Sequence, residues 1–230
     1  MTLHPLPAPD ILEYTLPEGH CCLITDDGSR MSTALASALA RRDWKPVLLS
    51  FPPTVVTPEP RELPAGVAQM TLDAMSEAAL QAQLTAITET YGPVGALIHL
   101  HPTFKSTQGL FDARERAIVK QVFLLAKHLQ PTFAAAAPQD RAAFMTVTRL
   151  DGALGLRGRG DGSLVGAGLP GLVKSLNLEW AGVFCRAVDL DPAMAPEDAA
   201  RAIVAELHDP NRLIVEVGRG PQGRVTPMRS

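Results

Sequence analysis

The stretch GLVKSLNLEWAGVFCRAVDLD, residues 171–191, contains a helix that leads directly into a strand. Its first half places Leu172, Leu176 and Trp180 at helical spacing on one face. Its second half, FCRAVDL over residues 184–190, is predicted to form a strand. Helices that alternate with strands build a parallel sheet covered by helices, so this stretch favours an α/β fold.

The same alternation continues on both sides of this stretch. Strands are predicted at residues 21–24, 44–51, 67–70, 94–100, 142–147 and 213–217. Helices are predicted at residues 31–39, 76–87 and 110–129 and from Pro196 onward, and the third of these is expected to end at Pro131. Because elements of these lengths alternate, we predict a Rossmann-like doubly wound, mainly parallel sheet with helices on both faces.

Two proline-rich segments are predicted to lack regular structure. Residues 1–19 contain four prolines between Pro5 and Pro17. We expect an arm or linker there, on the surface of a single domain that covers residues 20–230. Residues 52–64 contain five prolines, too many for a helix or a central strand, so they are expected to form an irregular surface loop.

Composition narrows the class of protein. The chain has 46% hydrophobic and only 5% aromatic residues, which is typical of a core of Ala, Val, Leu and Ile in a covered parallel sheet. Its net charge of −3 argues against a nucleic acid or a membrane surface as partner. Cys21, Cys22 and Cys185 match no metal or disulfide pattern and indicate buried, reduced thiols, so we expect a cytoplasmic protein.

The turn TDDGS at residues 25–29, the strand VGALIHLHP at 94–102, the stretch AFMTVTRLDG at 143–152 and residues 171–191 together resemble the short-chain dehydrogenase/reductase superfamily. The greatest similarity is to ketoreductase domains of polyketide and polyunsaturated-fatty-acid synthases. The resemblance implies NADPH across the carboxyl ends of the strands and hydride transfer to a β-ketoacyl group on an acyl carrier protein.

The turn at residues 25–32 departs from the family pattern TGxxxGxG. Its three glycine positions fall on Asp26, Arg30 and Ser32, and two neighbouring carboxylates would repel a pyrophosphate. The second strand ends without an acid for a ribose hydroxyl, which argues against NAD and leaves NADP as the candidate cofactor. The resemblance implies weak cofactor contacts from Thr25, Asp27, Gly28, Ser29, Arg30 and His101.

The resemblance also implies a Tyr that donates a proton and a Lys that lowers the pKa of that Tyr. Without gaps, these positions fall on Gly162 and Gly166. The two tyrosines of the chain, Tyr14 and Tyr91, lie far from this loop in the sequence. We therefore expect the reductive site to be largely missing.

Three other positions match the family more closely. Lys120 matches the lysine that synthase ketoreductases place in the helix after the fourth strand, although an exposed surface lysine is the simpler interpretation. The family's Ser falls on Arg149, with Thr148 just before it. Thr148 is a candidate carbonyl donor, and Arg149 is a candidate partner for an anionic group such as a phosphopantetheine phosphate.

His99 and His101 are expected to point to the same face of their strand, since they are two residues apart. Such a pair raises the question of zinc. No third ligand accompanies it at suitable spacing, so we predict no metal site and interpret the pair as polar groups at a strand end near a cleft.

Three hypotheses about function follow from the resemblance. The first is a catalytically degenerate ketoreductase-like domain that has a structural or interaction role in a polyketide or fatty-acid synthase. Its partners would be other synthase domains or an acyl carrier protein, and a homodimer is a further option. The alternatives are an active NADPH-dependent β-ketoacyl reductase with an unusual proton donor, such as water or His101 beside Lys120, and a module that binds the nucleotide without chemistry.

Overall fold

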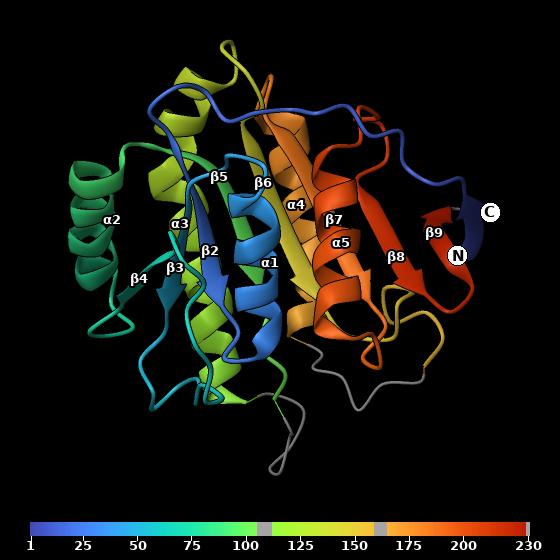
Figure 1. Ribbon diagram of the computed structural model, residues 1–230. Coiled ribbons are helices and arrows are strands. Elements are labelled where there is room, and N and C mark those ends of the chain that lie inside the picture. Colours follow the sequence, from blue (N-terminus) through green and yellow to red (C-terminus); the bar gives the residue numbers. More distant parts are fainter. Residues whose placement is uncertain (105–111, 159–164, 229–230) are drawn as a thin grey trace.

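A computed structural model describes residues 1–104, 112–158 and 165–228 (Figure 1). Its centre is one nine-stranded sheet in the order β1-β9-β8-β7-β6-β5-β2-β3-β4. The strands are β1 (Thr2–Leu6), β2 (Cys21–Asp26), β3 (Pro46–Ser50), β4 (Ala68–Thr71), β5 (Val94–Leu100), β6 (Ala143–Thr148), β7 (Phe184–Leu190), β8 (Glu216–Gly220) and β9 (Gly223–Met228). The helices are α1 (Arg30–Ala40), α2 (Glu77–Tyr91), α3 (Ala113–Ala136), α4 (Leu169–Glu179) and α5 (Pro196–Leu207), with a 3-10 turn η1 (Gly166–Gly168).

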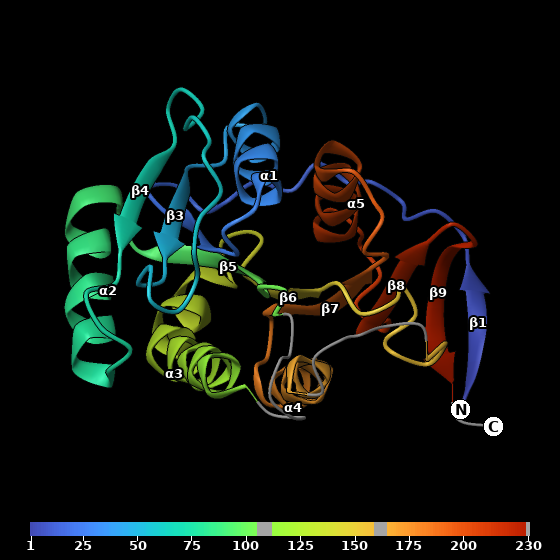
Figure 2. The same ribbon diagram turned by 90° about the horizontal axis from the view of Figure 1, so that it is seen from below.

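The seven strands from β4 to β8 in the sheet pair in parallel. The chain builds outward from β2 through β3 to β4, and then returns to β5 and builds in the other direction. Helices α1 and α5 cover one face of the sheet, while α2, α3 and α4 cover the other (Figure 2). The predicted Rossmann-like, mainly parallel fold is therefore confirmed.

Alternation along the central strands creates a separate core on each face. In β2, Cys21 and Leu23 pack with the cluster under α2, α3 and α4, whereas Cys22 and Ile24 pack with the cluster under α1 and α5. All six residues of β2 are buried, as a parallel sheet covered on both faces requires. Burial raises the pKa of the Cys21 thiol to about 11 and that of Cys185 to about 12, so both stay protonated near neutral pH.

The prediction that residues 1–19 contain no regular element is wrong. Residues Thr2–Leu6 form β1, which pairs antiparallel with β9 at the edge of the sheet. Pro5 stands opposite Val225 in this pairing. An edge strand tolerates proline because one of its two sides makes no ladder hydrogen bonds, and the partner strand lies more than 200 residues away in the sequence, beyond the reach of local patterns.

Two further boundaries were predicted wrongly. Helix α3 continues through Pro131 to Ala136. Burial of Phe133 offsets the cost of the missing N–H, since its ring packs 6.5 Å from the Phe144 ring centre. The last predicted strand, at residues 213–217, begins only at Glu216 and is followed by β9, which the sequence pattern did not reveal.

Candidate functional site

The candidate site lies at the carboxyl ends of β2 and β5, where the order of the parallel strands reverses. In doubly wound sheets this switch point is where ligands bind. The turn at residues 26–29 connects β2 to α1 here. Gly28 has φ +82°, and Ser29 caps α1 by accepting a hydrogen bond from Met31 N. The local geometry is thus a strand, a tight turn and a helix, as predicted.

The two acids of the turn are engaged within the turn itself. Asp26 Oδ1 accepts a hydrogen bond from Gly28 N at 2.9 Å. Asp27 Oδ1 accepts from Ser29 N at 3.1 Å and from Ser29 Oγ at 2.9 Å. Burial raises the pKa of Asp27 above its usual value. The turn therefore satisfies its own N–H groups with carboxylates, where a dinucleotide-binding turn would offer them to phosphate.

The proline-rich loop at residues 52–64 lies directly on this turn. A Cβ placed on Gly28 would stand 2.8 Å from Val56 Cγ1 and 3.0 Å from Thr57 O. The N–H of Glu59 donates to Gly28 O at 2.7 Å. A dinucleotide pyrophosphate needs the glycine face that Val56 covers. This face of the turn therefore has no space for it, and the residues present do not fit the cofactor.

A buried ion pair fastens the loop to the turn. The guanidinium of Arg61 contacts the Asp26 carboxylate, and both side chains are less than a tenth exposed. Arg61 also donates to Ser29 O at 3.2 Å, and Ser50 Oγ donates to Asp26 Oδ2 at 2.9 Å. Neither Arg61 nor the loop was expected at the site, since the residues are 35 positions from Asp26 and no local pattern connects them.

Behind the turn, a chain of hydrogen bonds crosses from β2 through β5 to α3. Thr25 Oγ1 lies 2.7 Å from His99 Nδ1, His99 Nε2 lies 3.2 Å from His101 Nδ1, and His101 Nε2 lies 3.1 Å from Glu115 Oε1. All four side chains are buried. The two histidines share a face, as their spacing predicted, but Glu115 was not foreseen as their partner.

The ends of this chain fix its direction. Leu100 N donates to Thr25 Oγ1, so the hydroxyl proton of Thr25 is free to go to His99 Nδ1. His99 must then donate from Nε2 to His101 Nδ1, and His101 from Nε2 to the Glu115 carboxylate. Every polar atom along the line is satisfied with both imidazoles neutral. His101 therefore has no ring nitrogen left to protonate a substrate.

This arrangement predicts a pH dependence of stability. Burial, and secondly His101, hold the pKa of His99 well below its ordinary value of 6.5, so the unfolded chain takes up a proton that the folded chain refuses. Stability is complete above the unfolded pKa and falls as pH drops below 6.5, by about 1.4 kcal/mol per pH unit for this group.

Urea unfolding between pH 7 and pH 5 measures the effect. The variant His99→Gln is expected to have a shallower slope by about one proton than the unmodified chain. His4, which is exposed on β1, supplies the control, since His4→Gln should leave the slope unchanged. Equal slopes in all three proteins would contradict the assignment.

Gly166, the position of the family's lysine, is part of the same cluster. Its N–H donates to Glu115 Oε1 at 3.1 Å. A Cβ at Gly166 would stand only 2.7 Å from His101 Nε2, so this ring occupies the space that a lysine side chain would need. Gly162, the position of the family's tyrosine, lies outside the described residues.

Neither tyrosine of the chain lies near the turn. Tyr14 stacks under the guanidinium of Arg141, which is 3.7 Å from the centre of the Tyr14 ring and precedes β6. Tyr91 ends α2 and precedes β5. Both positions are at the amino ends of the strands, whereas the turn is at their carboxyl ends. Tyr14 and Tyr91 therefore cannot serve as proton donors at the switch point.

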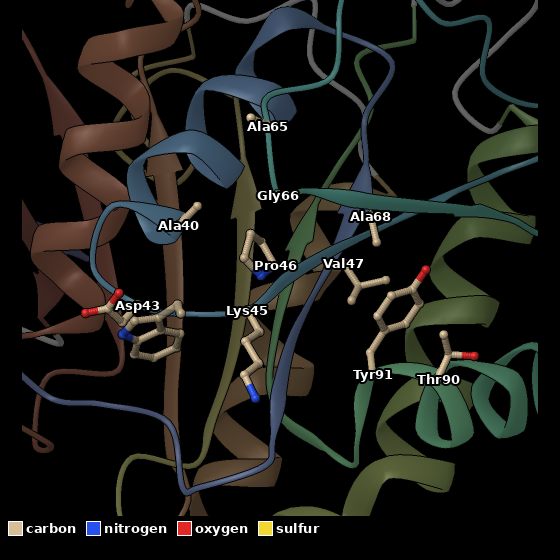
Figure 3. A pocket seen from close by; sticks show the side chains of 11 residues that line it. Ala40, Asp43, Lys45, Pro46, Val47, Ala65, Gly66, Ala68, Thr90 and Tyr91 are labelled. Carbon is tan, nitrogen blue, oxygen red and sulfur yellow. The ribbon is translucent and has the colours of Figure 1, made fainter.

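Tyr91 instead lines a surface cavity of about 670 Å3 at the amino ends of β3 and β4. Figure 3 shows its ring beside Val47 and Ala68, with Lys45 and Asp43 on other sides of the same cavity. This cavity lies at the opposite edge of the sheet from the turn. It does not extend the candidate site.

The residues after β6 are held by a buried carboxylate. Asp189, at the end of β7, accepts hydrogen bonds from Thr148 Oγ1 at 2.8 Å and from Leu150 N at 2.7 Å. Its second oxygen accepts from Ala153 N at 3.0 Å and Leu154 N at 2.8 Å. The hydroxyl of Thr148 is thus directed at Asp189. The prediction that Thr148 contacts a substrate carbonyl remains a prediction.

Arg149 and Lys120 have different surroundings. Arg149 donates to the carbonyls of Pro192 and Met194 at 2.7 and 3.1 Å, so its guanidinium connects the end of β6 to the loop before α5. Lys120 is exposed on α3. Arg30, another predicted contact, is also exposed, at the first turn of α1. Their predicted roles at a cofactor or substrate remain untested.

Two classes of feature are absent from the described residues. No group of three or more His, Cys, Asp or Glu side chains in residues 1–104, 112–158 and 165–228 is arranged to hold a metal ion. In the same part of the chain, no helix has the length and hydropathy needed to cross a membrane.

Comparison with known proteins connects this geometry to a sequence relative. No protein-family model matches the chain. One of the large subunits of a polyunsaturated fatty acid synthase from a Thraustochytrium species is 31% identical over 218 residues, which cover 92% of this chain. The chain spans 7% of the length of that relative, so it corresponds to one segment of a much longer protein.

Solved structures share the fold at low sequence identity. A 3-ketoacyl-(acyl-carrier-protein) reductase from Brucella melitensis, complexed with NADH, is 20% identical with a TM-score of 0.66 and covers 89% of this chain and 99% of its own. A short-chain dehydrogenase from Leptospira borgpetersenii with bound NAD+ is 10% identical with a TM-score of 0.66 and covers 87% of this chain and 91% of its own. These likenesses concern the fold alone.

Proposed function

Because this chain is a ketoreductase-like domain with the fold of the short-chain dehydrogenase/reductase superfamily, we propose that it is catalytically degenerate and has a structural or interaction role in a fatty-acid or polyketide synthase. Its synthase partners would be neighbouring domains or an acyl carrier protein, and the sequence relative from a synthase supports this setting.

The observation that carries the proposal is the closed cradle. Val56 covers the glycine of the turn, and Arg61 neutralises Asp26 where a cofactor phosphate would otherwise need a cation. The site also lacks a proton donor among its described residues, since both nitrogens of His101 face neighbours within the protein. A carbonyl reducer needs the hydride carrier and the acid together. This chain has lost the space for the first and the residue for the second.

Titration with NADPH tests the proposal. We expect no saturable change in nicotinamide fluorescence up to about 1 mM NADPH, which corresponds to a binding free energy weaker than about −4 kcal/mol. We also expect no oxidation of NADPH above background with an acetoacetyl thioester. The Brucella melitensis reductase, measured in parallel, is the positive control.

The two alternatives give different results in the same experiment. Binding in the micromolar range without turnover would favour a nucleotide-binding module. Binding with turnover would favour an active reductase with an unusual proton donor and would refute the proposal. The variant Val56→Asp sharpens the reading, because binding that truly uses the turn should weaken when a carboxylate is placed on Gly28.

A further inference from the structure

One face of α3 carries four exposed side chains in a line. They are Arg116, Lys120, Phe123 and Lys127, at successive spacings of four, three and four residues, which places them on one side of a helix. We call this set the α3 stripe. Phe123 is 57% exposed, which is unusual for a side chain of this size in a helix that otherwise buries its apolar residues.

The charge of the α3 stripe contrasts with that of the chain. The chain has a net charge of −3, yet the three charged residues of the α3 stripe are all cations. Lys127 Nζ lies 2.8 Å from Glu77 Oε1. Arg116 and Lys120 form no ion pair with any acid in the part of the chain that the structure describes. Unpaired exposed cations beside an exposed aromatic ring are available to a negatively charged partner.

A groove runs along the α3 stripe between α3 and α4. It has a volume of about 260 Å3. Its lining consists of Phe123, Ala126, Lys127, Gln130, Leu172, Leu176, Glu179 and Trp180. Apolar side chains from α4 therefore form one wall, and Phe123 and Lys127 of the α3 stripe form the opposite rim. Figure 2 shows α3 and α4 on the same face of the sheet, away from the layer of α1 and α5.

We propose that this α3–α4 face docks an acidic amphipathic helix of a partner protein. Carboxylates of that helix would meet Arg116, Lys120 and Lys127, and its apolar side chains would enter the groove beside Phe123 and against Trp180. The proposal deepens the proposed function and rests on it, since it names the chemistry of the partner that an interaction-bearing synthase domain would hold.

Two other occupants fit less well. In a symmetric dimer through the α3 stripe, each protomer would set its cations against the same cations of the second copy, which costs binding energy. A membrane surface is flat, whereas the apolar residues here line a groove and only Phe123 protrudes. Charge complementarity therefore selects an acidic helix.

The probe is a fluorescein-labelled 18-residue helical peptide with Leu at heptad a and d positions and Glu at the exposed ones. Its control peptide carries Lys in place of Glu. Fluorescence anisotropy at low salt is expected to show saturable binding of the acidic peptide and none of the basic one. The double variant R116E/K120E should weaken binding of the acidic peptide at least tenfold, and Phe123→Ala should weaken it about fivefold.

A matched variant separates specific docking from general charge. Arg41 and Arg42 are exposed at the far end of α1, and R41E/R42E changes the net charge by the same amount as R116E/K120E. It should alter binding less than twofold. Equal losses in the two double variants would overturn the proposal.

Two further measurements examine the rival occupants. Light scattering that shows a dimer which Phe123→Glu dissociates would overturn the proposal in favour of a second copy. Co-sedimentation with vesicles of phosphatidylcholine and phosphatidylserine, lost in R116E/K120E, would overturn it in favour of a membrane. NADPH turnover in the same preparation would refute the proposed function while leaving the docking result intact, so the two failures are distinguishable.

Discussion

Replacement of Glu206 by Ala is expected to lower the free energy of unfolding by about 3–5 kcal/mol. Glu206 is fully buried and accepts hydrogen bonds from Arg186 Nη1 at 2.5 Å, Arg219 Nε at 3.0 Å and Arg224 Nη2 at 2.7 Å. Its removal leaves the guanidiniums of Arg186 and Arg224 facing each other out of water, with Asp209 as their remaining carboxylate. Uncompensated buried charge is among the most destabilising changes a protein can suffer.

Urea unfolding followed by circular dichroism measures the loss. Asp198→Ala on the same helix removes an exposed ion pair with Arg201 and should cost less than about 1 kcal/mol. Glu206→Gln keeps the shape and removes the charge, so it supplies a second reading if the Ala variant does not fold. Similar losses for Asp198→Ala and Glu206→Ala would show that burial of this cluster has no energetic consequence.

The cluster explains how the two ends of the chain join one sheet. Arg186 comes from β7, Glu206 from α5 and Arg224 from β9. Arg224 Nη1 also donates to Pro7 O at 3.2 Å, just after β1. Hydrogen exchange of the β9 amides should therefore quicken more in Glu206→Ala than exchange in β2, which lies at the other side of the sheet.

The central sheet was predictable because its signal is local. Strand β5 was predicted at its observed bounds, Val94–Leu100, since seven consecutive residues are buried by helices on both faces. The caps of α1 and α2 follow from Ser29 and Ser76 in the same way. Strands β1 and β9 were missed because each contains proline and each is stabilised by a partner that no short window includes.

The candidate site divides along the same line. Loss of glycines from the turn and of the tyrosine and lysine could be read from single positions. Closure of the cradle by Val56 and Arg61 depends on a tertiary contact, and the pairing of His101 with Glu115 depends on the packing of α3 on β5. One signal was available and unused: the charged residues Arg186 and Asp189 interrupt an otherwise apolar strand, which requires buried partners.

Replacement of Asp189 by Ala is expected to cost about 3–5 kcal/mol of the free energy of unfolding. The carboxylate accepts hydrogen bonds from four backbone N–H groups after β6, at 2.7 to 3.3 Å, and from Thr148 Oγ1. Ala leaves these donors without an acceptor in a buried region. Asp189→Asn keeps one oxygen and is expected to lose about half as much, since its amide group opposes N–H donors.

Exchange of the amide protons of Leu150, Ala153 and Leu154, read by NMR, localises the effect. In Asp189→Ala these amides should exchange with water at least tenfold faster than in the unmodified chain, while those of β2 should change in proportion to global stability alone. A reductase presents its serine and tyrosine from this loop, and here the loop is folded inward around Asp189 with Thr148 directed at the same carboxylate. If protection of the three amides survives the Ala variant, other contacts hold the loop, and its closure would follow from packing rather than from this carboxylate.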